Sequence, residues 1–231
     1  MTDPGDAASF RLGYVPGVTP AKWARTWAER LPDVPLDLVA LDVAGAEPAV
    51  RAGTVDAGLV RLPIDRDGLH AIPLYTETTV VVAGKDHVVT AVDEVAVADL
   101  TGEVVLDPPD TGLTWPDGPP GVAPAAAVAT TAEAVELVAA GIGLLVVPQS
   151  LARLHHRRDL TYRPLTGAPE SGVVLTWPED RTTDLMEQFI GIVRGRTVNS
   201  SRTPARAAAA TPPAPARRAG SRPQGRRGRR R

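Results

Sequence analysis

The sequence predicts an α/β fold with two lobes. Short runs of apolar and β-branched residues alternate along the chain with amphipathic helical patterns, as in parallel-rich sheets that are covered by helices. A chain of 231 residues is long enough to form two such units. Because aromatic residues make up only 4% of the chain, we expect the cores to consist mainly of Val, Leu and Ala.

The first half of the chain shows strand and helix patterns in alternation. Pro16 and Gly17 turn the chain after the first strand, and Thr19 is placed to cap a helix that begins at Pro20. The β-branched run that follows Thr78 indicates a strand. We therefore expect strands over 11–15, 36–41, 57–60, 69–73 and 78–83, and helices over 20–31 and 47–52.

The second half contains a long loop, 107–124, with six prolines and three glycines, which are too many for a helix or a central strand. Thr130 or Thr131 then caps a helix that stops at Gly141, and Pro148 ends a buried strand. We expect strands over 104–106, 128–130, 144–147, 162–165 and 173–177, and helices over 132–140, 150–156 and 183–194.

The most informative segment is VRAGTVDAGLVRLP, residues 50–63. Gly53 suits the left-handed end of a helix, and the apolar run 57–60 is short enough to be a buried strand. Arg61 follows at the carboxyl end of that strand. Because open α/β sheets hold ligands at the carboxyl ends of their strands, Arg61 is a candidate for pairing with a ligand carboxylate.

Four segments are informative when they are taken in order: FRLGYVPG at 10–17, VRAGTVDAGLVRLP at 50–63, PLYTETTVVV at 73–82 and the residues 130–150. Together they resemble the effector-binding domain of LysR-type transcriptional regulators. The resemblance implies a two-lobed fold like that of the type 2 periplasmic binding proteins. It also implies that lobe one consists of 10–83 plus 160–196, that lobe two consists of 84–159, and that a small-molecule effector binds between the lobes.

Helix N-termini with small hydroxyl residues occur in both predicted lobes. In the resembled family, hydroxyl residues at such places hold carboxylate effectors, and the free N–H groups of a helix N-terminus favour an anion. We therefore expect Thr19 of lobe one and Thr130 and Thr131 of lobe two to face one cleft. The predicted ligand contacts are Gly17, Val18, Thr19, Arg61, Pro63, Thr111, Thr130, Thr131 and Pro148.

The predicted contacts also have purely structural interpretations. The threonines cap their helices whether or not they touch a ligand, and a proline such as Pro148 simply ends a strand. Arg61 is equally suited to a salt bridge with Asp65 or Asp67. The loop 107–124 is either a lid over the cleft, with Thr111 near its base, or a surface insertion.

The first predicted helix places Trp23, Trp27 and Leu31 on one stripe. This stripe either packs into the core or forms a subunit interface, where aromatic residues are enriched. The resemblance implies a side-by-side dimer in which this helix takes part. A homodimer, or a heterodimer with a full-length regulator, is therefore expected.

Charge is distributed unevenly along the chain. Residues 1–196 hold all 27 acidic residues and 15 of the 25 Lys and Arg, whereas residues 197–231 hold ten arginines and no acid. This Arg/Ala/Pro-rich tail is expected to be disordered, because it has too few large apolar residues to offset the entropy of ordering. Its charge suits non-specific binding to nucleic acid, and a tail without function is the alternative interpretation.

No motif indicates a catalytic or metal site. The chain has no cysteine, and the adjacent His155 and His156 lack the i, i+4 spacing of a helical metal pair. We therefore expect no metal, no cofactor and no enzymatic activity. The N-terminus lacks the apolar region of a signal peptide, and no long apolar run indicates a membrane span. A cytoplasmic protein without a membrane partner is expected.

The resemblance also leads to an expectation about the DNA-binding part of a LysR-type regulator. The first predicted strand begins close to Met1, which leaves no room for the winged helix-turn-helix of a full regulator. We expect a binding module for a small, anionic metabolite that acts as an accessory in transcription regulation. The alternatives are a nucleic-acid-associated protein that acts through its basic tail, and an enzyme on the same bilobal fold.

Overall fold

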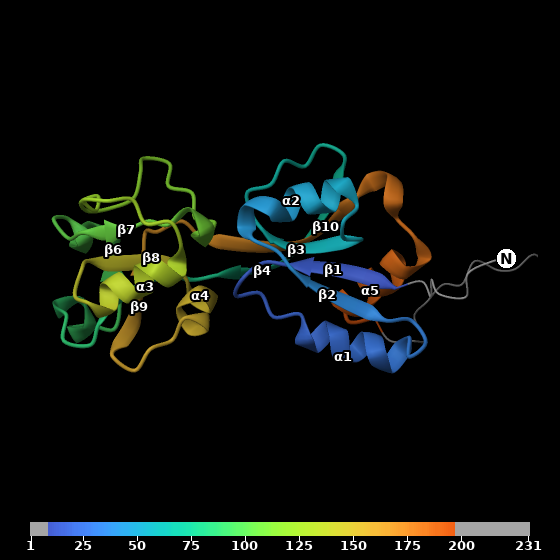
Figure 1. The fold of residues 1–231 in the computed structure, drawn as a ribbon, viewed down its shortest axis with the longest axis horizontal. Coiled ribbons are helices and arrows are strands. Elements are labelled where there is room, and N and C mark those ends of the chain that lie inside the picture. Colours follow the sequence, from blue (N-terminus) through green and yellow to red (C-terminus); the bar gives the residue numbers. More distant parts are fainter. Residues whose placement is uncertain (1–8, 197–231) are drawn as a thin grey trace, which may run out of the picture.

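The computed structural model describes residues 9–196 as two mixed α/β lobes that lie side by side (Figure 1). Lobe one is built on a five-stranded sheet in the order β2-β1-β3-β10-β4, in which β10 runs antiparallel to both of its neighbours. Its elements are β1 (Phe10–Tyr14), α1 (Ala21–Arg30), β2 (Leu36–Ala40), α2 (Val43–Ala52), β3 (Ala57–Arg61), β4 (Leu69–Glu77), β10 (Ser171–Pro178), η4 (Glu179–Arg181) and α5 (Asp184–Val193).

Lobe two is built on a second five-stranded sheet, in the order β6-β9-β5-β8-β7. Its elements are β5 (Thr79–Gly84), η1 (Val88–Ala91), β6 (Val95–Ala96), η2 (Val97–Leu100), β7 (Val105–Leu106), η3 (Pro109–Thr111), α3 (Thr131–Ala139), β8 (Leu144–Pro148), α4 (Gln149–Leu154) and β9 (Leu160–Thr166). The predicted two-lobed α/β fold is therefore confirmed. The predicted disorder of the tail concerns residues 197–231, which lie outside the described residues.

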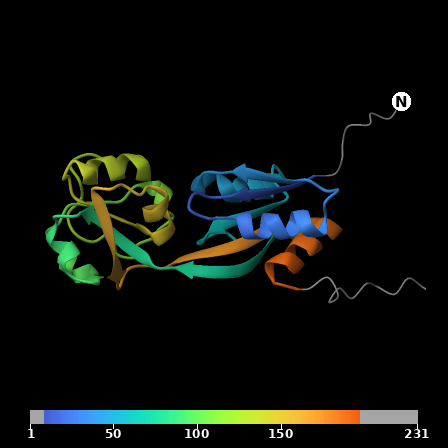
Figure 2. The same cartoon turned by 90° about the horizontal axis from the view of Figure 1, so that it is seen from below.

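The chain passes between the lobes twice, at Thr78 between β4 and β5 and at residues 167–170 between β9 and β10 (Figure 2). These positions correct the expected lobe boundaries of 83/84 and 159/160, because β5 and β9 pair with each other inside the sheet of lobe two. The correction has a physical reason. β4 and β5 form an almost continuous extended segment, so the local pattern carries no signal for the residue at which it changes sheets.

Each lobe has its own apolar core. In lobe one, Phe10, Trp27 and Phe189 pack together, with ring centroids 5.1–5.9 Å apart. Trp27 is 1% exposed and donates a hydrogen bond from Nε1 to the carbonyl oxygen of Val34, so it belongs to the core, and Trp23 packs partly buried against the same core. The core of lobe two around β5, β8 and α3 is almost entirely aliphatic. No helix within residues 9–196 combines the length and the apolar character needed to cross a membrane.

Three local predictions are wrong. Helix α1 begins at Ala21, and its N-cap is Pro20, which has no side-chain acceptor, so Thr19 does not cap it. Helix α2 begins at Val43 rather than at residue 47, because the carboxylate of Asp42 caps it and Pro48 is accommodated inside it. The predicted strand over 128–130 joins neither sheet of the described chain.

Candidate functional site

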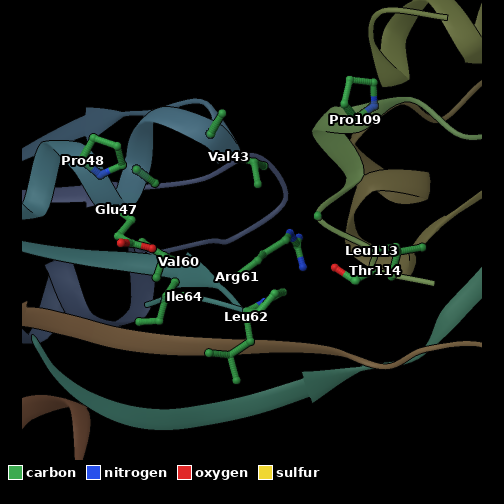
Figure 3. Close-up of a pocket in the computed structure, with 14 residues that line it drawn as sticks. Val43, Glu47, Pro48, Val60, Arg61, Leu62, Ile64, Pro109, Leu113 and Thr114 are labelled. Atoms are coloured by element: carbon green, nitrogen blue, oxygen red, sulfur yellow. The ribbon is translucent and has the colours of Figure 1, made fainter. Parts of the chain in front are cut away.

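A cavity of about 420 Å³ lies between the two lobes, and we call it the cleft pocket. One wall comes from α2, the end of β3 and the residues that follow it, and the other comes from η3 and the loop behind it (Figure 3). The lining residues are Val43, Ala44, Ala46, Glu47, Pro48, Val60, Arg61, Leu62, Pro63, Ile64, Pro109, Gly112, Leu113 and Thr114. Its volume and its position between lobes are typical of small-molecule sites.

Most side chains around the cleft pocket are aliphatic, and Glu47 and Arg61 are its two charged residues. The carboxylate of Glu47 accepts hydrogen bonds from Nε of Arg51, at 2.9 Å, and from the backbone N–H of Asp65, at 3.1 Å. The negative charge of Glu47 is thus balanced by groups of the chain itself. On the same helix, Pro48 lacks the N–H that a helix would donate to the carbonyl oxygen of Ala44, and both residues line the pocket.

Arg61 is fully buried, and its guanidinium is surrounded by polar groups. Nη1 donates to Oγ of Ser171 at 2.9 Å and lies 3.4 Å from Oε2 of Glu77. Nη2 donates to the carbonyl oxygen of Pro16 at 3.1 Å and to Oγ of Ser150 at 2.9 Å. Among the described residues, Nε of Arg61 is the one buried side-chain polar atom without a hydrogen-bond partner.

The salt bridge that the sequence suggested for Arg61, with Asp65 or Asp67, is therefore wrong. Arg51 binds this acidic pair instead, through an ion pair with the carboxylate of Asp65 at 3.4 Å and a hydrogen bond to the carbonyl oxygen of Asp67. The reason is the direction of the Arg61 side chain. The side chain of Arg61 extends away from the loop that carries the two aspartates and toward lobe two (Figure 3).

Gly17 packs directly against the hydroxyl of Ser150, which accepts a hydrogen bond from Arg61. Its φ of +81° is a conformation that favours glycine, and a Cβ at this position would lie 2.4 Å from Oγ of Ser150 and 3.0 Å from Nη2 of Arg61. Gly17, Thr19, Glu77 and Ser150 line a second hollow, of about 350 Å³. The cluster of Arg61, Glu77 and Ser150 therefore separates this hollow from the cleft pocket.

The N-terminus of α3 is bound by a carboxylate of the chain itself. The backbone N–H of Thr131 donates to both carboxylate oxygens of Asp110, at 2.8 and 3.0 Å, and its hydroxyl donates to one of them at 2.7 Å. Thr130 caps the helix as predicted, since its Oγ1 accepts the N–H of Glu133. Asp110 thus occupies the place that was predicted for a ligand anion.

Substitution of Asp110 by alanine is expected to lower the free energy of unfolding by about 1–2 kcal/mol, because it removes an anionic cap from a helix N-terminus. Urea titration measures this change. Asp117→Ala is the matched control, since Asp117 is an exposed aspartate of the same loop and its loss should change stability by less than about 0.5 kcal/mol. Equal effects of the two substitutions would contradict a capping role.

The other predicted contacts are distributed over different parts of the molecule. Pro63 lines the cleft pocket together with Arg61. Val18 is buried in the core of lobe one, and Thr111 is buried with its Oγ1 accepting the N–H of Leu113. Pro148 is the last residue of β8 and pairs with β5. Thr19, Thr130 and Thr131 are not among the residues that line the cleft pocket, so the expected threonine-lined cleft does not form there.

Several residues of the site escaped the sequence analysis. They are Val43, Ala44, Ala46, Glu47 and Pro48 on α2, Leu113 and Thr114 in the loop, and the polar partners Glu77, Asp110, Ser150 and Ser171. One available signal was Asp42, a good N-cap residue that would have extended α2 to the pocket. The polar partners come from distant parts of the chain, and no local pattern marks them.

Two pKa shifts occur next to the site. Burial raises the pKa of the Tyr75 phenol, the charge of Glu77 raises it further, and Arg61 opposes the shift. Burial also raises the pKa of Asp107, at the start of the loop that carries Asp110. In both cases the first cause is partial desolvation, which disfavours the charged form of the side chain.

These features define a class: a two-lobed α/β domain with a pocket between its lobes, as in the type 2 periplasmic binding proteins. Comparison with known families matches residues 5–197 to the LysR substrate binding domain. The chain belongs to this family, as the resemblance in the sequence implied.

Curated relatives include the Hca operon transcriptional activator HcaR of Escherichia coli, which is 26% identical over 83% of this chain. A probable hydrogen peroxide-inducible genes activator of Mycobacterium avium is 30% identical over 71% of the chain. The matched regions span 66% and 57% of the lengths of these two relatives.

Solved structures with the same fold include the effector binding domain of a BenM variant, with a TM-score of 0.68 and 20% identity over 81% of this chain and 93% of that one. A mutant OxyR regulatory domain from Pseudomonas aeruginosa gives a TM-score of 0.65 and 19% identity over 81% of this chain and 97% of that one. At these identities the likeness establishes the fold.

Proposed function

We propose that the chain binds a small-molecule effector in the cleft pocket and takes part in transcription regulation in the cytoplasm, without catalysing a reaction. The observation that carries this proposal is that both lobes line the pocket, α2 from lobe one and the loop behind η3 from lobe two. A ligand there contacts both lobes and therefore favours one arrangement of the lobes over others. Membership in the LysR substrate binding domain family supports effector binding.

We propose further that the effector is a small anion with an apolar body. Aliphatic residues such as Val43, Ile64 and Leu113 favour the apolar part, and the guanidinium of Arg61 attracts a carboxylate. Because Glu77 already pairs with Arg61, an incoming carboxylate competes with it. Benzoate is the first probe, since one solved BenM domain is described as bound to its effector benzoate.

Thermal-shift measurements with benzoate and other small aromatic and aliphatic carboxylates test this proposal. An effector present at 100 times its Kd should stabilise the protein by about 2.7 kcal/mol and raise its Tm. Ala44→Phe is expected to abolish the rise, because Ala44 is exposed on α2 and lines the pocket, so the larger ring fills it.

Ala52→Phe is the matched control. Ala52 is exposed on the same helix but is not among the residues that line the cleft pocket, so this variant should respond to the ligand like the unsubstituted protein. A rise in Tm that Ala44→Phe leaves unchanged would place the ligand elsewhere. The absence of any rise across the whole panel would count against an anionic effector.

The proposed partners follow from the family. We propose a homodimer, or a heterodimer with a full-length regulator. The half-buried Trp23 on α1 supports a subunit contact on this helix, since it leaves part of an indole ring uncovered. Nucleic-acid binding through the basic tail stays an alternative proposal that concerns residues outside the described range.

A further inference from the structure

A single hydroxyl of lobe two is held by two charged residues of lobe one. Oγ of Ser150, on α4, donates to Oε2 of Glu77 at 2.6 Å and accepts a hydrogen bond from Nη2 of Arg61 at 2.9 Å. Arg61 ends β3 and Glu77 ends β4, so both belong to the sheet of lobe one. The ion pair and the hydroxyl together form a bridge between the lobes.

This bridge lies where the chain passes from lobe to lobe. Glu77 is the residue before Thr78, at which the first crossing occurs, and Ser171, which accepts a hydrogen bond from Arg61, begins β10 directly after the second crossing. A rotation of lobe two about these crossings moves Ser150 relative to Arg61. Because Ser150 belongs to lobe two and its two partners belong to lobe one, a change in the angle between the lobes alters these contacts.

Burial makes the bridge strong, and one missing hydrogen bond keeps it from being permanent. The side chains of Arg61 and Glu77 are 0% and 9% exposed, so their attraction is poorly screened. Nε of Arg61, however, is buried without a partner. Such a group is unfavourable, and opening of the lobes would relieve it by admitting water. Burial of the ion pair thus favours the arrangement in which the bridge is formed, and the unpaired Nε of Arg61 favours an arrangement in which the lobes have opened.

From these contacts we propose that Arg61, Glu77 and Ser150 form an inter-lobe latch that sets how far the cleft pocket is open. The role of the latch in effector binding rests on the function proposed above, whereas its role in holding the lobes does not. A ligand carboxylate that competes with Glu77 for Arg61 would weaken the latch, and in this way occupancy of the pocket is coupled to the angle between the lobes.

The absence of cysteine from the chain allows the latch to be tested without a ligand. Cysteines introduced as Lys22→Cys on α1 and Ala140→Cys after α3, both at exposed positions in different lobes, carry spin labels. Double electron–electron resonance on the full chain, diluted with unlabelled protein, then reports the distance between the two labels, and hence between the lobes, within one molecule.

Ser150→Ala is expected to lengthen or broaden the inter-lobe distance distribution, because it removes both hydrogen bonds of the latch hydroxyl. Ser171→Ala is the matched control, since it also removes a hydroxyl partner of Arg61 but one that lies in the sheet of lobe one. The control should keep the original distribution. An unchanged distribution in Ser150→Ala, or an equal change in both variants, would overturn the proposal.

A second pair of variants tests the latch without altering Ser150. Gly17→Ala places a Cβ 2.4 Å from Oγ of Ser150 and should also lengthen or broaden the distribution. Gly68→Ala carries similar backbone strain, with φ of +68°, but has no atom within 4 Å of the new Cβ, and should leave the distances unchanged. Because none of these measurements needs an effector, a failed ligand screen and a failed latch are distinguishable.

Discussion

Replacing Arg61 with alanine is expected to lower the free energy of unfolding by about 3–5 kcal/mol. The substitution leaves the carboxylate of Glu77 in a buried place, with its side chain only 9% exposed and its cationic partner removed. It also leaves the hydroxyls of Ser150 and Ser171 without their guanidinium donor. Urea unfolding, followed by circular dichroism, measures the loss.

Arg51→Ala is the control for this prediction. Arg51 makes ion pairs with Glu47 and Asp65, but its side chain is 35% exposed, so its loss is expected to cost about 0–1 kcal/mol. The double variant Arg61→Met with Glu77→Leu should recover most of the loss seen in Arg61→Ala, because it removes both charges from the buried site. Equal losses in Arg61→Ala and Arg51→Ala would show that burial of the pair is unimportant.

Trp27→Ala is expected to destabilise the protein by about 3–5 kcal/mol, since it opens a large cavity in the core of lobe one. The indole ring stacks on Phe10 with centroids 5.1 Å apart, and it also contacts Phe189. The carbonyl oxygen of Val34 loses the hydrogen bond that Nε1 donates. Chemical unfolding measures the change in free energy.

Trp23→Ala offers a comparison within the same helix and the same type of side chain. Because Trp23 is only partly buried, its loss is expected to cost about 1–2 kcal/mol. Light scattering on the same variant reports whether the oligomeric state changes. A larger loss for Trp23→Ala than for Trp27→Ala would contradict the assignment of Trp27 to the core.

The fold was accessible from the sequence because its signals are local. The β-branched run that begins at Thr79 and the apolar run that ends at Arg61 have the length and flanks of buried strands, and Gly53 ends α2 in the predicted left-handed conformation. The partners of the strands are not local. β10 lies between β3 and β4 in the sheet, and nothing in its own sequence specifies that neighbourhood.

The site was only partly predictable for the same reason. Arg61 was identified by its position at the end of a strand, but its hydroxyl partners lie 89 and 110 residues further along the chain. The hydroxyl and backbone N–H of Thr131 were expected to be available to an anion. Asp110, 21 residues earlier, binds both, and a carboxylate in a proline-rich loop has no feature that reveals such a contact.

The two crossings between the lobes have a consequence for the order in which the protein is made. Lobe two is one continuous segment, from Thr79 to Thr166, whereas lobe one requires β10 and α5, which are synthesised after lobe two. Until β10 emerges, β4 has no neighbour in its sheet. Domains tend to fold as units during synthesis. Lobe two can therefore complete its core before β10, the strand that lies between β3 and β4 in lobe one, has been synthesised.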